Sequence, residues 1–124
     1  MKVPRILLVV PGLLAGLLVP AIIAAPKPAP AGAVGMVGDD FARSAVTIHR
    51  GQRLTLVNDS NVVHVIGPGR DTAIISPERG VPMTGFHLMQ TNKAFTTGRW
   101  MRVGTFYLTC SVHPGMTLKV VVIR

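Results

Sequence analysis

The feature that most constrains the fold of this 124-residue chain is a short polar loop between two apolar stretches near its C-terminus. The loop reads Cys110-Ser111-Val112-His113-Pro114-Gly115-Met116, and residues 105–109 and 117–123 flank it. Both flanks are rich in β-branched residues, which favours two β-strands joined by a short connection. Such a hairpin can direct the Cys, His and Met side chains toward one point.

The spacing of these side chains, Cys-x2-His-x2-Met, indicates a metal site. Cys110 is the only cysteine in the sequence, so it cannot form an internal disulfide, and His64 upstream offers a second imidazole. Taken singly, each residue type more often packs or faces solvent than binds a metal. Together, thiolate and thioether favour copper over hard cations, and two His with one Cys and a weak Met form the ligand set of a blue-copper centre. The sequence therefore predicts one copper ion bound by His64, Cys110, His113 and Met116.

The N-terminal 25 residues are typical of an exported protein. Lys2 and Arg5 precede an uncharged run over residues 6–25, as in a secretory signal peptide. The run of about 20 residues could also span a bilayer if it stays attached. We therefore expect residues 1–25 to be a signal peptide or a membrane anchor, with the cleavage point left open. The location would be periplasmic, extracellular or at the cell surface.

Residues 26–38, with the sequence PKPAPAGAVGMVG, differ in composition from the remainder of the chain. This Pro/Ala/Gly-rich stretch predicts an extended linker. From residue 39 the chain consists of short Val, Ile, Thr and Leu runs separated by Gly, Pro, Asn and Asp. Seven or eight short strands without a helix predict an all-β, two-sheet Greek-key β-sandwich over residues 39–124.

Strands are expected over residues 45–49, 53–58, 62–66, 105–109 and 117–123, with shorter apolar pieces at 73–75 and 86–89. Gly67-Pro68-Gly69 is expected to end the third of these strands. This assignment puts His64 in the middle of a strand and the other three candidate ligands in the C-terminal loop.

The chain is basic, with a formal net charge of +8. Without residues 1–31, which contain Lys2, Arg5 and Lys27, the charge falls to +5. A basic domain favours acidic protein partners or an anionic envelope surface. The arginines are scattered along the sequence and no aromatic-basic stripe accompanies them, so a nucleic-acid partner is not expected.

Two segments resemble the cupredoxin family, the group that contains plastocyanin, pseudoazurin and amicyanin. GTFYLTCSVHPGM followed by TLKVVV resembles the family's C-terminal copper-ligand hairpin, and RLTLVNDSNVVHV resembles the segment that carries the first His ligand. The resemblance covers roughly residues 45–124. The tight Cys-x2-His-x2-Met spacing is most similar to the amicyanin type.

The resemblance implies a role for each candidate ligand. His64 and His113 would bind copper through imidazole nitrogens, Cys110 through its thiolate, and Met116 as the distant axial ligand. It further implies that the protein is a monomeric electron carrier and not an enzyme. Such a carrier would exchange single electrons with redox partner proteins through the exposed edge of His113.

The sequence departs from the family pattern beside the first His. Val65 stands where Asn or Asp often follows this ligand and ties the two ligand-bearing segments together, and Val63 replaces a common Pro. The surrounding shell that orients the ligands is therefore expected to be built differently. Ser111, Asn58 and Asn61 are candidates to replace the tie.

A second interpretation is copper(I) delivery or storage in the cell envelope. Met83, His87 and Met89, with Met101 and Met116, could form a softer and more open copper(I) site. Hydrolytic catalysis is not indicated, because the chain offers no Ser-His-Asp set and no paired carboxylates.

Overall fold

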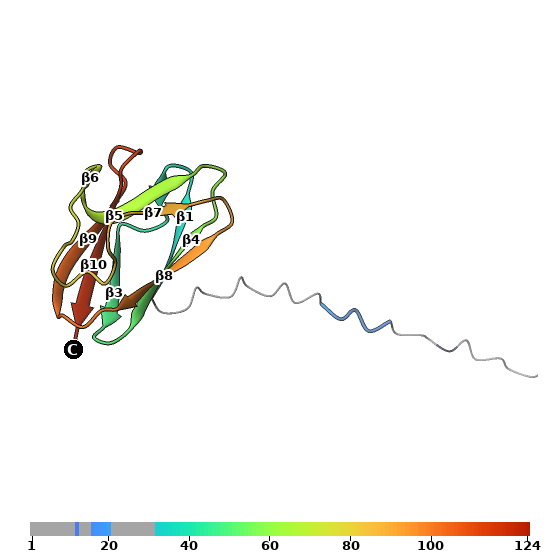
Figure 1. The fold of residues 1–124 in the computed structure, drawn as a ribbon. Helices are drawn as coiled ribbons and strands as arrows, with labels where there is room; N and C mark the ends of the chain where they lie inside the picture. Colours follow the sequence, from blue (N-terminus) through green and yellow to red (C-terminus); the bar gives the residue numbers. More distant parts are fainter. Residues whose placement is uncertain (1–11, 13–15, 21–31) are drawn as a thin grey trace, which may run out of the picture.

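The computed structural model describes residue 12, residues 16–20 and residues 32–124. Residues 32–124 form two β-sheets that pack face to face and contain no helix (Figure 1). No helix among the described residues has the length and apolar character needed to cross a membrane. The predicted two-sheet, all-β sandwich is thus confirmed. The predicted leader over residues 1–25 lies largely outside the described residues.

The first sheet has four strands in the order β2-β1-β4-β8. β1 pairs in parallel with β4, while β2 and β8 pair antiparallel with their neighbours. The strands are β1 (Ala33–Val37), β2 (Asp40–Phe41), β4 (Arg53–Asn58) and β8 (Ala94–Arg99).

The second sheet has the order β3-β10-β9-β5-β6, and β7 also pairs with β5. Its strands are β3 (Ala45–His49), β5 (His64–Arg70), β6 (Ala73–Ile74), β7 (His87–Met89), β9 (Gly104–Cys110) and β10 (Thr117–Ile123). Several neighbours are distant in sequence, so connections cross between the sheets, as in Greek-key sandwiches.

Three predicted strands have the observed bounds, namely β3, β4 and β10. The prediction for residues 62–66 is wrong at both ends, because β5 begins at His64 and continues through Gly67-Pro68-Gly69 to Arg70. The glycines are needed where β6 folds back onto β5. A Cβ atom at Gly69 would overlap the carbonyl oxygen of Ala73, and Gly69 has φ +143°. Here the glycines allow close strand pairing and do not end the strand.

Residues 33–37, which the sequence placed in the linker, belong to the sandwich as β1. Val34 and Met36 are fully buried, and β1 pairs with β4 from Ala33↔Thr55 to Met36↔Asn58. The linker prediction is therefore wrong here, because Pro, Ala and Gly nearby mask a short strand pattern. Residues 26–31 of the expected linker lie outside the described residues.

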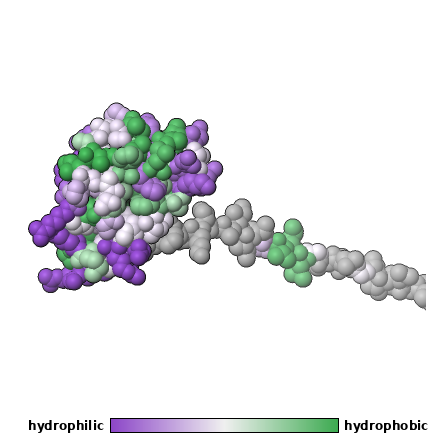
Figure 2. Space-filling view, viewed as in Figure 1, coloured by the Kyte–Doolittle hydropathy of each residue, from purple (hydrophilic) through white to green (hydrophobic). Residues whose placement is uncertain are grey.

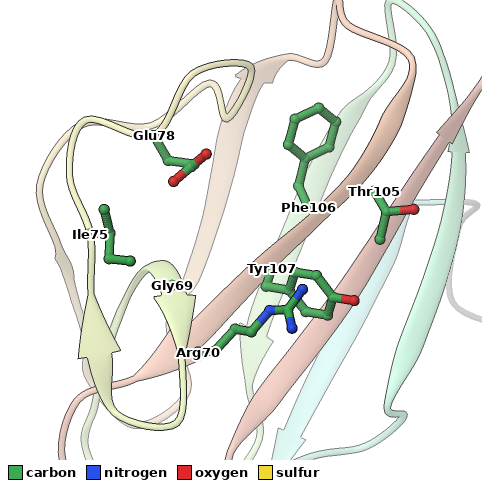
Figure 3. A pocket seen from close by; sticks show the side chains of 7 residues that line it. All are labelled: Gly69, Arg70, Ile75, Glu78, Thr105, Phe106 and Tyr107. Atoms are coloured by element: carbon green, nitrogen blue, oxygen red, sulfur yellow. The ribbon is translucent and has the colours of Figure 1, made fainter.

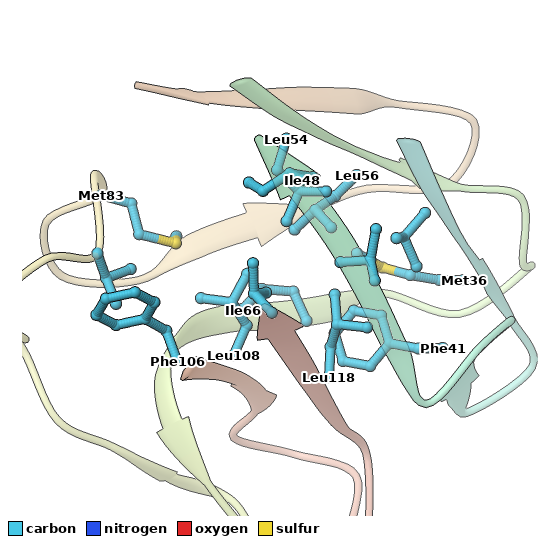
Figure 4. Packing of buried hydrophobic residues seen from close by; sticks show 14 of the residues in the cluster. Met36, Phe41, Ile48, Leu54, Leu56, Ile66, Met83, Phe106, Leu108 and Leu118 are labelled. Atoms are coloured by element: carbon cyan, nitrogen blue, oxygen red, sulfur yellow. The ribbon is translucent and has the colours of Figure 1, made fainter. Parts of the chain in front are cut away.

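The core lies between the sheets and follows the two-residue period of the strands. Alternate side chains of β3, β4 and β10 are buried, namely Val46, Ile48, Leu54, Leu56, Leu118, Val120 and Val122. Figure 4 labels Ile48, Leu54, Leu56 and Leu118 among them. Trp100 is also fully buried, and its indole N–H donates to Thr97 Oγ1 at 2.9 Å.

The two ends of the sandwich bring together different segments of the chain. At one end β4 and β9 stop and β5 starts, which brings Asn58, Cys110 and His64 into one region. We call this the Cys110 end. At the opposite end lie the β3–β4 turn and the last residues of β10, and we call it the Arg53 end.

Truncation of a buried β1 side chain tests whether this strand belongs to the domain. We expect Met36→Ala to lower the free energy of unfolding by about 2–5 kcal/mol, because it removes a fully buried side chain. Val37→Ala is the matched control, since Val37 is 63% exposed. Chemical denaturation measures both variants, and equally small effects would show that β1 is not part of the cooperative core.

Candidate metal centre

Three of the four predicted ligands meet at the Cys110 end. His64 starts β5, Cys110 ends β9, and His113 lies in the following loop. His113 Nδ1 is 3.1 Å from His64 Nδ1 and 3.3 Å from Cys110 Sγ, and one donor atom from each residue lies within 4.8 Å of the others. Metal–ligand bonds to N and S are roughly 2.0–2.3 Å long, so one ion could contact all three atoms after small adjustments.

Backbone pairing between β5 and β9 produces this convergence. Ile66 is opposite Cys110 in the sheet register. The Val65 N–H donates to Cys110 Sγ at 3.5 Å, and the Ser111 N–H donates to the Val65 carbonyl at 2.9 Å. These two bonds use only main-chain groups of Val65. A side-chain tie at this position is therefore unnecessary.

A tight turn closes the loop between the donors. The Met116 N–H donates to the His113 carbonyl at 3.2 Å, with Pro114 and Gly115 at the two central positions. Gly115 has φ +80°, the value that the second central residue of a type II turn requires. The Cys110 N–H also donates to the Met116 carbonyl at 3.0 Å. Met116 is fully buried in the same apolar cluster as Cys110, and its role as a ligand stays a prediction.

The far side of the His64 ring contacts a polar network in the β4–β5 loop. Ser60 Oγ is 3.0 Å from His64 Nε2 and 2.6 Å from Asn58 Oδ1. The Asn58 amide nitrogen donates to the carbonyls of Val62 and Met89, at 2.8 and 3.0 Å. This fixes the orientation of the amide, so Oδ1 faces Ser60 and accepts its hydroxyl proton.

The network determines which nitrogen of His64 carries the proton. Because the Ser60 hydroxyl donates to Asn58, its oxygen accepts a hydrogen bond from His64 Nε2–H. His64 Nδ1 is then unprotonated and faces His113 and Cys110. Burial, followed by repulsion from His113, lowers the pKa of His64, while the Gly38 carbonyl and Asp39 act in the opposite direction. The buried ring is thus held neutral, as a metal ligand must be.

Sequence reasoning identified part of this network. Asn58 was one of three candidates for a tie between the two ligand-bearing segments, but its side chain joins the β4–β5 loop to β7 and not to the Cys110–Met116 loop. No side-chain hydrogen bond places Ser111 or Asn61 in that role among the described residues. Ser60 was missed because a serine in an Asn-Asp-Ser-Asn stretch is ordinary loop chemistry.

Three residues of the second interpretation, Met83, His87 and Met89, lie in packing positions, whereas Met101 is 55% exposed. Met83 and Met89 are buried in the core, and His87 stacks on Phe95 with ring centroids 3.9 Å apart. The Gly98 N–H donates to the Pro82 carbonyl at 3.0 Å, so the residue before Met83 lies beside β8.

A surface hollow of about 310 Å³ lies away from the three donors. Its lining includes Glu78, Phe106 and Tyr107 but none of the candidate ligands. Figure 3 shows the Arg70 guanidinium over the Tyr107 ring, 3.4 Å from the centroid, which is a cation–π contact. This hollow is therefore separate from the candidate metal centre.

Several solved structures have an architecture similar to that of this chain. A purple cupredoxin from Nitrosopumilus maritimus superposes with a TM-score of 0.61 at 18% identity, over 74% of this chain and 99% of that one. Amicyanin from Paracoccus versutus superposes with a TM-score of 0.58 at 24% identity, over 78% of this chain and 85% of that one. An oxidised point mutant of amicyanin superposes with a TM-score of 0.60 at 20% identity, over 81% of this chain and 89% of that one.

The chain has the cupredoxin fold. No protein-family model and no curated protein matches its sequence. The similarity therefore lies in three-dimensional structure, and it covers most of the chain.

The donor set of this cupredoxin fold suits a soft metal ion. It combines one sulfur donor with two imidazole nitrogens, and His64 and Cys110 are fully buried. Thiolate and imidazole donors select copper or zinc rather than magnesium or calcium. A structural zinc site normally has four strong ligands, whereas the fourth predicted ligand here is the weak thioether of Met116. The chemistry of the cluster therefore fits copper.

Loss of the Ser60 hydroxyl tests the assigned proton position. We expect Ser60→Ala to leave His64 in a mixture of tautomers in the metal-free protein, which ¹⁵N NMR of the ring detects. Copper(I) affinity should fall by about 10–100-fold, the usual cost of losing a partner that orients a ligand. Ser60→Thr retains a hydroxyl and should restore both properties.

Asn61→Ala is the matched control, because Asn61 is an exposed residue of the same loop. If the His64 tautomer is unchanged in Ser60→Ala, the hydroxyl does not determine it.

Proposed function

We propose that this chain is an exported type 1 copper protein that carries single electrons between redox partner proteins. One copper ion would be held by His64, Cys110, His113 and Met116. The observation that supports this most directly is the convergence of the Cys110 sulfur with the two Nδ1 atoms at one end of a cupredoxin fold.

Bound copper would supply the one-electron chemistry, alternating between copper(II) and copper(I). The protein's contribution is to hold the donors in nearly the same place in both states. Hydrogen bonds fix His64 through Ser60, Cys110 through the Val65 N–H, and the loop through the Met116 carbonyl. A site that is fixed in this way requires little movement on a change of charge.

The surface near His113 suits brief contacts with other proteins. The His113 ring is partly exposed, while His64 is fully buried. Val63 and Val112, which precede the two His residues, are 45% and 54% exposed. Leu88, which pairs with Val65 across β5 and β7, is 51% exposed. Exposed apolar side chains around a partly exposed ligand favour a docking surface.

The proposal includes export, which is supported by the basic start and uncharged run of residues 1–25. It assigns the chain a carrier role rather than an enzymatic one. The copper-delivery alternative is less well supported, because Met83, His87 and Met89 make packing contacts in the described part of the chain.

The visible and electron-spin spectra of the purified protein with copper(II) test the proposal. We expect an intense thiolate-to-copper charge-transfer band, because Cys110 supplies the thiolate. Cys110→Ser should abolish this band, while Ser111→Ala in the same loop should retain it. A colourless native protein with an ordinary tetragonal copper(II) signal would contradict a type 1 centre.

Replacement of Met116 tests the axial ligand. Met116→Gln should retain copper and colour but lower the reduction potential, because a harder oxygen donor stabilises copper(II) relative to copper(I). Voltammetry measures the change, and Met89→Leu serves as a control at a buried methionine of β7. An unchanged potential in Met116→Gln would show that Met116 is not the axial ligand.

A further inference from the structure

Arginines that are scattered in the sequence come together at the Arg53 end. Six of them lie there and all six are exposed, namely Arg50, Arg53, Arg79, Arg99, Arg102 and Arg124. In Figure 2 hydrophilic side chains project from the lower edge of the domain, near the C-terminus marked in Figure 1. The arginines are scattered along the sequence, but these six lie close together in the folded domain, so the expectation that they are not clustered is wrong.

Strand pairing places two of these arginines side by side. Arg53 and Arg99 are direct partners across β4 and β8. The Arg53 guanidinium donates to the Thr97 carbonyl at 3.1 Å, and the Arg99 guanidinium donates to the Gly51 carbonyl at 2.9 Å. Both contacts use neutral acceptors, so neither arginine loses its charge to a carboxylate through them.

Loop contacts bring the other four arginines to the same end. The Arg50 N–H donates to the Ile123 carbonyl at 2.7 Å, which puts Arg50 beside the C-terminal Arg124. The Arg102 side chain lies against Gly80, where an added Cβ would be 3.1 Å from Arg102 Cδ. Arg79 immediately precedes this glycine.

Most carboxylates lie at the opposite end. Asp39 and Asp40 follow β1 at its Cys110 end, and Asp59 follows β4. The Asp71 N–H donates to Thr117 Oγ1, at the start of β10. Of the five acidic residues, only Glu78 lies toward the Arg53 end. The domain is therefore electrically polarised along its length.

Exposed apolar side chains accompany the arginines. Met101 and Val103, in the β8–β9 connection, are 55% and 45% exposed. A hollow of about 300 Å³ beside them is lined partly by Arg99, Met101 and Arg102. Arginine heads around exposed apolar residues match the two layers of a membrane surface, with phosphates outside and acyl chains beneath.

The N-terminal segment joins the domain at this same end. The Thr55 N–H donates to the Gly32 carbonyl at 2.7 Å, and Ala33 pairs with Thr55 at the start of β1. The preceding 31 residues contain the uncharged run 6–25 together with Lys2, Arg5 and Lys27. The chain thus enters the described domain at the Arg53 end, directly after a segment whose composition is typical of a signal peptide or membrane anchor.

We propose that the Arg53 end docks on anionic phospholipid, with its arginines on headgroup phosphates and with Met101 and Val103 at the acyl boundary. Charge complementarity requires an anionic occupant, and the exposed Met101 and Val103 among the arginines, together with the entry point of the N-terminal segment, favour a membrane over an acidic protein. Docking in this orientation points the Cys110 end away from the lipid.

The full chain tests this with vesicles of phosphatidylcholine alone or mixed with phosphatidylglycerol. The measured quantity is the binding constant for anionic vesicles divided by the binding constant for neutral vesicles. This ratio isolates the contribution of charge. The triple variant Arg50→Gln/Arg102→Gln/Arg124→Gln removes three arginines that make no side-chain hydrogen bond among the described residues. Arg43→Gln/Lys93→Gln/Lys119→Gln removes the same charge from elsewhere on the domain.

We expect the first triple variant to lower this ratio by roughly a hundredfold and the second to leave it near that of the native chain. Unfolding curves check that both variants fold. Equal ratios in all three proteins, or an equal loss in both variants, would overturn the proposal.

Amide hydrogen exchange gives the orientation independently. Anionic vesicles should slow exchange in residues 100–103 and leave residues 111–115 unchanged. Protection of residues 111–115 instead would contradict the proposed orientation. If soluble polyglutamate protects residues 100–103 and anionic vesicles do not, the surface binds an acidic protein and the membrane proposal is wrong.

Discussion

The antiparallel pairing of β5 with β9 is the constraint on which the candidate centre depends. It places Cys110, the last residue of β9, opposite Ile66, two residues after the start of β5, so that His64 and Cys110 lie close together although they are far apart in the chain. The Val65 N–H then donates to Cys110 Sγ, and the Ser111 N–H donates to the Val65 carbonyl. Because these donors belong to the main chain, the cluster survives the absence of a polar side chain at position 65.

Around this pairing, the burial of polar groups is matched by hydrogen bonds. Asn58, Ser60 and His64 are all buried, and an unpaired polar group there would be destabilising. The Asn58 amide donates to carbonyls of β7 and of the β4–β5 loop, the Ser60 hydroxyl donates to the Asn58 amide oxygen, and His64 Nε2–H donates to the Ser60 hydroxyl oxygen. The network therefore stabilises the fold and orients the ring with the same bonds.

The sequence predicted the parts of the molecule that depend on local pattern. Val46 and Ile48 alternate with exposed residues, and Cys110, His113 and Met116 lie in one short loop, so both the strand and the cluster could be recognised. β1 was not recognised, because it is stabilised by parallel pairing with β4, which local composition does not encode. Ser60 was hidden for a related reason. Its importance arises from the position of Asn58 and His64 in space, not from its neighbours in sequence.

The two ends of the sandwich differ in the side chains that they expose. At the Cys110 end, apolar residues such as Val112 and Leu88 are exposed beside a buried polar cluster, which suits transient contact with another protein. At the Arg53 end, charge is gathered by the pairing of Arg53 with Arg99 and by the contact of Arg50 with the last strand. Because strands run between the two ends, a surface that holds the Arg53 end would leave the Cys110 end free for a partner. In the two proposals made above, attachment and electron exchange therefore take place at opposite ends of the same sandwich.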